Sequence, residues 1–299
     1  PASARGASAI DPELGEAAEK DDDRSLALQA LVEGEATLMM MVDMERAQGG
    51  TGKELLKSSP PAMDFSMRLM SGLMPFASGK AFRNAPPIFR ETMMFPYLKG
   101  MVFLLHLTNE NEWDRVNEAF RKPPLSTEQV LHPEKYLKEI DDPTEIVLPP
   151  FGEAIGGEWK ELGQNVLGEL QISILLRKHQ GAKAAAGWDG DRYAVFKGPD
   201  DNLGLVWYTT WDSESEAQEF AAAYARYLGS RLGFNDSANS NRNDTAPAAV
   251  PDHLRLEHQG RVYDIFRRDS DVVTVEGFSA KDTDDFAKIV FNSEKLANE

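Results

Sequence analysis

The stretch RSLALQALVEGEATLMMMVDMER, residues 24–46, predicts one long helix that is apolar nearly all the way round. At about 100° per residue, its leucine, valine, alanine and methionine side chains leave no broad polar face, so we expect most sides of the helix to be buried. Glu33 and Glu35 stand in its middle and point to nearly opposite sides. Because carboxylates are rarely buried unless they are paired or bind a metal, we expect a cation or a cluster of donors beside at least one of them.

The string ALVEGEA, residues 30–36, resembles the second metal-binding helix of the gluzincin metallopeptidases, where a Glu-Gly or Glu-Ala pair supplies the third zinc ligand. The resemblance implies that Glu33 is a zinc ligand and that Glu35 is not. A longer similarity to bacterial gluzincin-like proteins runs from Leu26 to about Asp212, through FPYLKG, PPLSTEQVLHPEKYL, LGEL and AAGWDGDRY. Those proteins carry a His-Glu-x-x-His helix upstream, and no such motif occurs in these 299 residues.

Gluzincins use a His or Tyr from a later segment to stabilise the oxyanion that forms when zinc-bound water attacks a peptide carbonyl. The resemblance implies three candidates for this role, His132, Tyr136 and Tyr97. Spacing singles out none of them. The segment STEQVLHPEKYL, residues 126–137, also has a purely structural interpretation, in which Ser126 or its neighbour caps a turn and the glutamine that follows reaches back.

The formal net charge of −17 argues against a nucleic-acid or anionic-membrane partner, because like charges repel at close range. No run reaches the roughly 18 uncharged apolar residues of a membrane span. The most apolar stretch is interrupted by Glu33, Glu35 and Asp43. The sequence has no cysteine, so neither a disulfide nor a thiolate metal site is possible.

The sequence begins at Pro1, without an initiator Met and without the basic and then apolar pattern of a signal peptide. We interpret Pro1 as a cut end, in which case an upstream fragment of the same protein carries the missing helix and is a partner of this chain. The alternative is a pseudoenzyme that has lost this helix. The resemblance and the cut-looking start favour a secreted or cell-envelope protein of a bacterium, with a cytoplasmic location as the alternative.

From Trp188 onward, the helical spacing gives way to a pattern of strand, turn, strand and helix that occurs twice. The first copy contains DRYAVFK and LGLVWYTTW, with a helix opened by Asp212; the second contains RVYDIFRR and VVTVEGF, with a helix opened by Ser279. We expect one antiparallel sheet with the helices on one face. Residues 235–251 between the copies predict a surface loop, and GWDGDRY favours a tight turn over a calcium loop.

The predicted fold class is therefore α+β, with a mostly helical N-terminal half followed by this antiparallel sheet. We divide the chain into a flexible lead over residues 1–23, a helical metallopeptidase-like domain over 24–181 and an α+β repeat domain over 182–299. In the helical domain, apolar residues recurring at three and four predict a long helix over 158–179. Pro96 predicts the start of another helix.

Two functions remain open. In the first, the chain is part of a zinc metallopeptidase-like protein that hydrolyses peptides but is catalytically incomplete without the upstream segment, so we expect weak zinc binding at best. In the second, it is a non-catalytic pseudopeptidase that acts as a binding or scaffold module, in which Glu33 contacts an arginine or a backbone donor instead of a metal.

Overall fold

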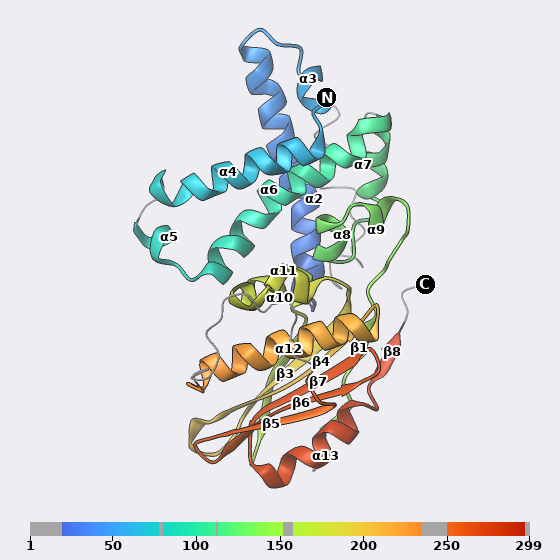
Figure 1. The fold of residues 1–299 in the computed structure, drawn as a ribbon. Helices are drawn as coiled ribbons and strands as arrows, with labels where there is room; N and C mark the ends of the chain where they lie inside the picture. The colour runs from blue at the N-terminus through green and yellow to red at the C-terminus, as the bar shows by residue number, and fades with distance from the viewer. Residues whose placement is uncertain (1–19, 78–79, 112, 152–157, 235–249, 297–299) are drawn as a thin grey trace. The chain divides into compact units, whose positions relative to one another are not determined.

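The computed structural model describes residues 20–77, 80–111, 113–151, 158–234 and 250–296 (Figure 1). The chain forms two compact units, Pro1–Asp142 and Pro143–Glu299. The predicted α+β class is confirmed, since helices make up the first unit and a six-stranded antiparallel sheet lies in the second. The division follows Asp142 and not residue 181 as predicted, because residues 160–165 form a strand of this sheet.

The described part of the first unit consists of α2 (Asp22–Ala47), α3 (Lys53–Leu56), α4 (Pro60–Ala77), α5 (Lys80–Asn84), α6 (Pro87–Asn111), α7 (Asp114–Ala119), α8 (Thr127–Leu131) and α9 (Glu134–Leu137). Most of the predicted flexible lead, residues 1–19, lies outside the described residues. Pro96 does not begin a helix, because it lies inside α6. This helix starts at Pro87, and a proline at the first helical position costs no intrahelical hydrogen bond.

The predicted long helix is present as α2, and its N-cap is Asp21. The Asp21 carboxylate accepts the backbone N–H of Arg24 at 2.9 Å, which satisfies one of the free donors of the first turn. The expected burial on most sides is wrong. Only one stripe at spacings of three and four is buried, comprising Asp23, Leu26, Ala27, Ala30, Leu31, Gly34, Leu38 and Val42.

By length and composition alone, α2 is the one described helix that could cross a membrane. A core helix of a soluble protein passes the same test, and the buried stripe of α2 packs chiefly against α6. Glu33 and Glu35 interrupt its apolar surface midway. The described residues therefore contain no clear membrane span.

The segment from α8 to α9 is built around local hydrogen bonds, as its structural interpretation predicted. Ser126 is the N-cap of α8 and accepts the N–H of Gln129 at 3.2 Å. The Gln129 side chain reaches back, and its Oε1 accepts the N–H of Leu125 at 2.7 Å. The start of α8 is tied to α2, because Asp23 accepts the N–H of Thr127 at 3.0 Å and its hydroxyl at 2.5 Å.

The described part of the second unit consists of β1 (Glu145–Val147), β2 (Lys160–Asn165), α10 (Gly168–Leu175), η2 (Arg177–His179), α11 (Gly181–Ala185), β3 (Trp188–Lys197), η3 (Pro199–Asp201), β4 (Leu203–Trp211), α12 (Glu214–Arg231), β5 (His253–His258), β6 (Arg261–Arg268), β7 (Asp271–Phe278), α13 (Ala280–Val290) and β8 (Glu294–Leu296). The predicted loop between the two repeats lies outside the described residues from 235 to 249.

The six-stranded sheet has the order β2-β3-β4-β7-β6-β5, and every neighbouring pair is antiparallel. Both predicted hairpins, β3-β4 and β6-β7, are present, and α12 is opened by Ser213 rather than Asp212. The helices do not share one face. Trp207 packs with Phe220 of α12 and the next residue, Tyr208, belongs to the core that contains Phe286 of α13, so the two helices cover opposite faces.

Residues 158–179 do not form the predicted long helix. They form β2, α10 and η2, and Gly168 has φ +71°, a left-handed conformation that a continuous helix excludes. GWDGDRY is not a tight turn either. From Trp188 it is the start of β3, with a register shift between Trp188 and Gly190.

Candidate functional site

The proposed zinc ligand, Glu33, lies in the middle of α2, and its side chain is partly buried. Among the described residues, no hydrogen bond or ion pair reaches its carboxylate; only its backbone carbonyl is engaged, by the hydroxyl of Thr37 at 2.7 Å. Glu35 is also partly buried, and this burial raises the pKa of its carboxyl. Neither glutamate is fully interior, and the expected cluster of donors is not present among the described residues.

The glycine between the two glutamates has a packing role. A Cβ atom on Gly34 would lie 2.3 Å from the backbone carbonyl carbon of Gly100 in α6, closer than real contacts allow. A Cβ on Gly100 would in turn lie 2.0 Å from the carbonyl oxygen of Ala30. The backbones of α2 and α6 therefore touch at this crossing, which fixes the part of α2 that presents Glu33.

The three candidates for oxyanion stabilisation lie on different elements. Tyr97 is on α6 with an exposed side chain, His132 ends α8, and Tyr136 is in α9. The structure brings none of them into a hydrogen bond with Glu33, whose carboxylate has no described partner.

The hydroxyl of Tyr136 is already engaged, because it donates to the carbonyl oxygen of Lys122 at 2.6 Å. Its ring lies edge-on to Phe103, with centroids 5.3 Å apart, and burial raises its pKa to about 12. Nδ1 of His132 lies 3.9 Å from the Glu134 carboxylate. Tyr136 is thus held as a structural hydrogen-bond donor, whereas Tyr97 and His132 remain accessible to solvent in part.

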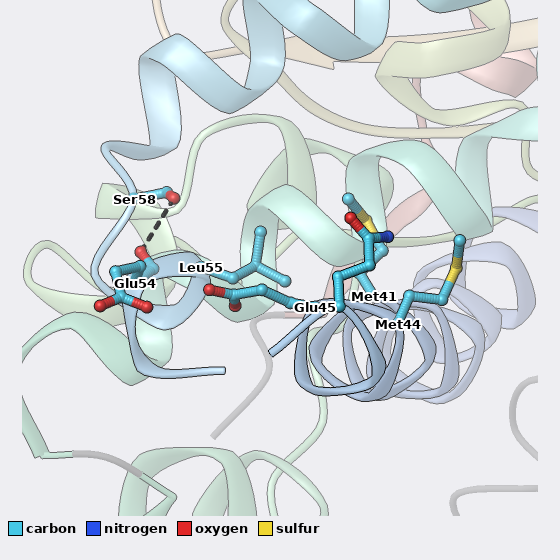
Figure 2. A pocket seen from close by; sticks show the side chains of 7 residues that line it. Met41, Met44, Glu45, Glu54, Leu55 and Ser58 are labelled. Carbon is cyan, nitrogen blue, oxygen red and sulfur yellow. Dashed lines mark hydrogen bonds between the residues drawn. The ribbon is translucent and has the colours of Figure 1, made fainter. Parts of the chain in front are cut away.

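A pocket of about 390 Å³ lies where α2 ends and α3 begins (Figure 2). Its lining residues are Met41, Met44, Glu45, Gln48, Glu54, Leu55 and Ser58. Loss of solvent together with a hydrogen bond to Glu54 raises the pKa of Glu45, and the same bond lowers the pKa of Glu54. The two carboxyl groups therefore shift each other's pKa in opposite directions. Sequence reasoning missed this pair, because eight residues and a helix break separate its members.

In the second unit, Asp191 of β3 is a buried carboxylate that accepts four N–H groups. The donors are the backbone of Leu167 and Gly168 at 3.0 and 2.9 Å, and the indoles of Trp188 and Trp207 at 3.0 and 2.9 Å. Burial raises the pKa of Asp191 to about 6, although the four donors act in the opposite direction. All four acceptor positions are used, so Asp191 joins β3 and β4 to the start of α10 and is a structural residue.

Glu276 of β7 is a second buried carboxylate, and it connects the sheet to α12. The hydroxyl of Tyr224 donates to its Oε1 at 2.5 Å, and Nη2 of Arg231 donates to its Oε2. Burial and the nearby negative charge of Glu276 raise the pKa of Tyr224 well above its ordinary value. The guanidinium of Arg231 also lies 5.6 Å from the ring centroids of Tyr227 and Tyr263.

Asp264 of β6 is the third, and it is completely buried. Arg255 of β5 donates to both of its oxygens, at 2.8 and 2.9 Å. Nε2 of His253 lies 3.0 Å from Oδ1 of the same carboxylate, and the His253 ring stacks on Phe266. A bidentate arginine neutralises this aspartate, so the histidine beside it lacks the isolated negative partner of a catalytic base.

Residues 156–287 match the model of a domain of unknown function (DUF8575). The matched range contains β2 to β7 with Asp191, Asp264 and Glu276, and it does not contain Glu33 or the three oxyanion candidates. No curated protein and no solved structure matches the chain.

Proposed function

We propose that this chain is part of a zinc metallopeptidase-like protein in which the carboxylate of Glu33 is one metal ligand. The observation that carries the proposal is a partly buried carboxylate in the middle of an apolar helix, with no hydrogen bond or ion pair among the described residues. Such a group retains its lone pairs for a ligand from elsewhere. The crossing of Gly34 with Gly100 supports the proposal, because it holds the ligand-bearing turn of α2 in place.

Zinc in peptidases takes three protein ligands and a water molecule. The Glu33 carboxylate can supply one of these three ligands and cannot form the site by itself. The two histidine ligands and the general base would come from outside these 299 residues, so the chain is catalytically incomplete by itself. Bound zinc would supply Lewis acidity and a water molecule of lowered pKa. Here Glu33 would hold the metal, and His132 or Tyr97 would donate to the developing oxyanion, because the hydroxyl of Tyr136 is bonded to Lys122.

The second candidate is a non-catalytic binding or scaffold module. It is favoured by the polar side chains of the α8 to α9 segment, which form hydrogen bonds and ion pairs within the segment and with the residues just after it. Gln129 donates to Asp141 and Asp142, both at 2.8 Å, and Lys135 binds Glu128 and Asp141 at 2.8 and 2.6 Å. These contacts stabilise the α8 to α9 segment and leave few of its groups for a substrate.

The test uses the protein expressed from its whole natural reading frame, with zinc content measured by mass spectrometry after dialysis. We expect the substitution Glu33→Ala to remove bound zinc and peptidase activity together. The matched control, Glu35→Ala, changes a partly buried glutamate on the other side of the same helix and should preserve both. Retention of zinc by Glu33→Ala contradicts the proposal, whereas a wild-type protein without zinc supports the scaffold. Tight binding of one zinc ion per molecule by the 299-residue chain alone would also contradict the proposal.

A further inference from the structure

Helices α4, α5 and α6 form a helical hairpin that exposes large apolar side chains to solvent. In Figure 1, α4 and the first half of α6 run back toward α5, which joins them. The exposed fractions are 70% for Phe65, 62% for Leu69, 64% for Phe89 and 55% for Met93. Phe65 and Leu69 are four residues apart on α4, and Phe89 and Met93 are four apart on α6. Each helix therefore carries an exposed apolar stripe.

This exposure accompanies a packed inner side of the same helices. Met67 of α4 and Phe95 of α6 are buried. An ion pair of 2.5 Å joins Asp64 of α4 to Lys99 of α6. The hairpin thus buries one set of apolar residues against the first unit and presents a second set outward. Large apolar side chains exposed on two helices that pack together are a feature of interaction sites.

The charge of the hairpin is opposite to that of the chain. Residues 60–111, which span α4, α5 and α6, contain five basic and three acidic residues, a net charge of +2, while the whole chain carries −17. Lys57, just before α4, and Lys80 and Arg83 of α5 are exposed and form no ion pair within the described residues. The net negative charge of the whole chain argued against an anionic membrane partner, but the net charge of this hairpin is positive, so that argument does not apply to it.

From this combination we propose that the α4-α5-α6 hairpin docks on a membrane surface that bears anionic lipid headgroups. Phenylalanine, leucine and methionine side chains enter the boundary between headgroups and acyl chains, while lysine and arginine bind the headgroup phosphates. Basic residues near an anionic surface and buried apolar side chains both strengthen the attachment, so these three cations and four apolar side chains suit reversible binding. The helices lie on the bilayer and do not cross it. This proposal is independent of the role of Glu33.

The test is flotation of the purified chain with vesicles of phosphatidylcholine containing about 30% phosphatidylglycerol, compared with phosphatidylcholine alone. We expect binding to the anionic vesicles that weakens when salt rises from about 0.1 M to about 0.5 M. The apolar variant Phe65→Ser, Leu69→Ser, Phe89→Ser and Met93→Ser should reduce binding at least tenfold, as should the charge variant Lys57→Glu, Lys80→Glu and Arg83→Glu. Because all seven side chains are exposed, circular dichroism should stay unchanged.

Matched control variants change exposed residues outside the hairpin. Ile140→Ser with Leu203→Ser controls the loss of apolar surface, and Lys160→Glu with Lys178→Glu controls the change of charge. Both should bind vesicles as the wild type does. Failure of the wild type to float with anionic vesicles, or equal binding to neutral ones, overturns the proposal. Concentration-dependent self-association that only the apolar variant abolishes, without vesicle binding, would assign the surface to a second copy of the chain and also overturn it.

Discussion

Gly34 of α2 and Gly100 of α6 meet at a helix crossing where neither position has room for a Cβ atom. The neighbouring atoms are backbone atoms of the opposite helix, which cannot move aside as a flexible side chain could. The tightest contact between elements of the first unit therefore depends on two glycines, and one of them separates the two glutamates of the proposed ligand motif.

The substitution Gly34→Ala should lower the free energy of unfolding by about 1–3 kcal/mol, because the added methyl group forces α2 and α6 apart. Urea denaturation followed by circular dichroism measures it. The matched control is Gly229→Ala, inside α12, where a Cβ would meet only the carbonyl oxygen of Phe234 at 4.0 Å. Alanine is a better helix former than glycine by about 1 kcal/mol, so this variant should be neutral or more stable. Equal destabilisation by both variants would disprove the close crossing.

Removing the carboxylate of Asp191 should be among the most destabilising substitutions in the second unit. Asp191→Ala leaves four buried N–H groups without an acceptor, for which we expect a loss of about 3–5 kcal/mol. Near-ultraviolet circular dichroism should also change, since the indoles of Trp188 and Trp207 lose their fixed partner. Glu257→Ala, at an exposed position of β5, serves as the control and should change stability by no more than about 0.5 kcal/mol. Native-like stability of Asp191→Ala would rule out the four-donor arrangement.

The contact between α12 and the sheet can be tested by removing a single hydroxyl group. Tyr224→Phe abolishes a buried hydrogen bond to the charged Glu276, so the free energy of unfolding should decrease by about 1.5–3 kcal/mol. Tyr227→Phe removes the same group from a tyrosine whose hydroxyl has no hydrogen bond among the described residues. Its melting temperature should stay near that of the wild type. If the two variants melt together, the Tyr224 hydroxyl does not stabilise the unit.

His106 of α6 should contribute to the pH dependence of stability. Burial lowers the pKa of this histidine in the folded chain. Between the lowered value and the ordinary value near 6.5, the unfolded chain binds more protons, so stability is lost as the pH falls through this interval. Denaturation at about pH 7.5 and about pH 5 should therefore show a larger loss for the wild type than for His106→Gln. His258→Gln is the control, and a wild-type loss matched by His106→Gln would refute the assignment.

Local patterns predicted many of the elements correctly. The alternation in DRYAVFK, LGLVWYTTW, RVYDIFRR and VVTVEGF predicted four strands, because every second side chain of a strand faces the same side of a sheet. The prediction over residues 158–179 was wrong, since spacing alone cannot show that Gly168 adopts a positive φ to donate its N–H to Asp191. That acceptor lies 23 residues further along the chain, beyond any helical window.

Local sequence patterns were also insufficient to predict the surroundings of the candidate site. The sequence identified Glu33 as a carboxylate in apolar surroundings, and the structure shows that only one stripe of α2 is buried and that Glu33 lies partly outside it. A helical pattern gives the relative direction of two side chains, but the neighbour that covers them decides their burial. For α2 this neighbour is chiefly α6, which begins 40 residues after α2 ends.

The sequence by itself determined the α+β class, the long first helix, both strand hairpins and the capped turn at Ser126, because each depends on backbone geometry and side chains within a few residues of one another. Only the tertiary structure decided that α12 and α13 cover opposite faces of the sheet, that Gly34 meets Gly100, and that Asp191 collects four donors. These contacts join residues distant in the chain, and the close packing and hydrogen bonding that fix them exist only once the units have folded.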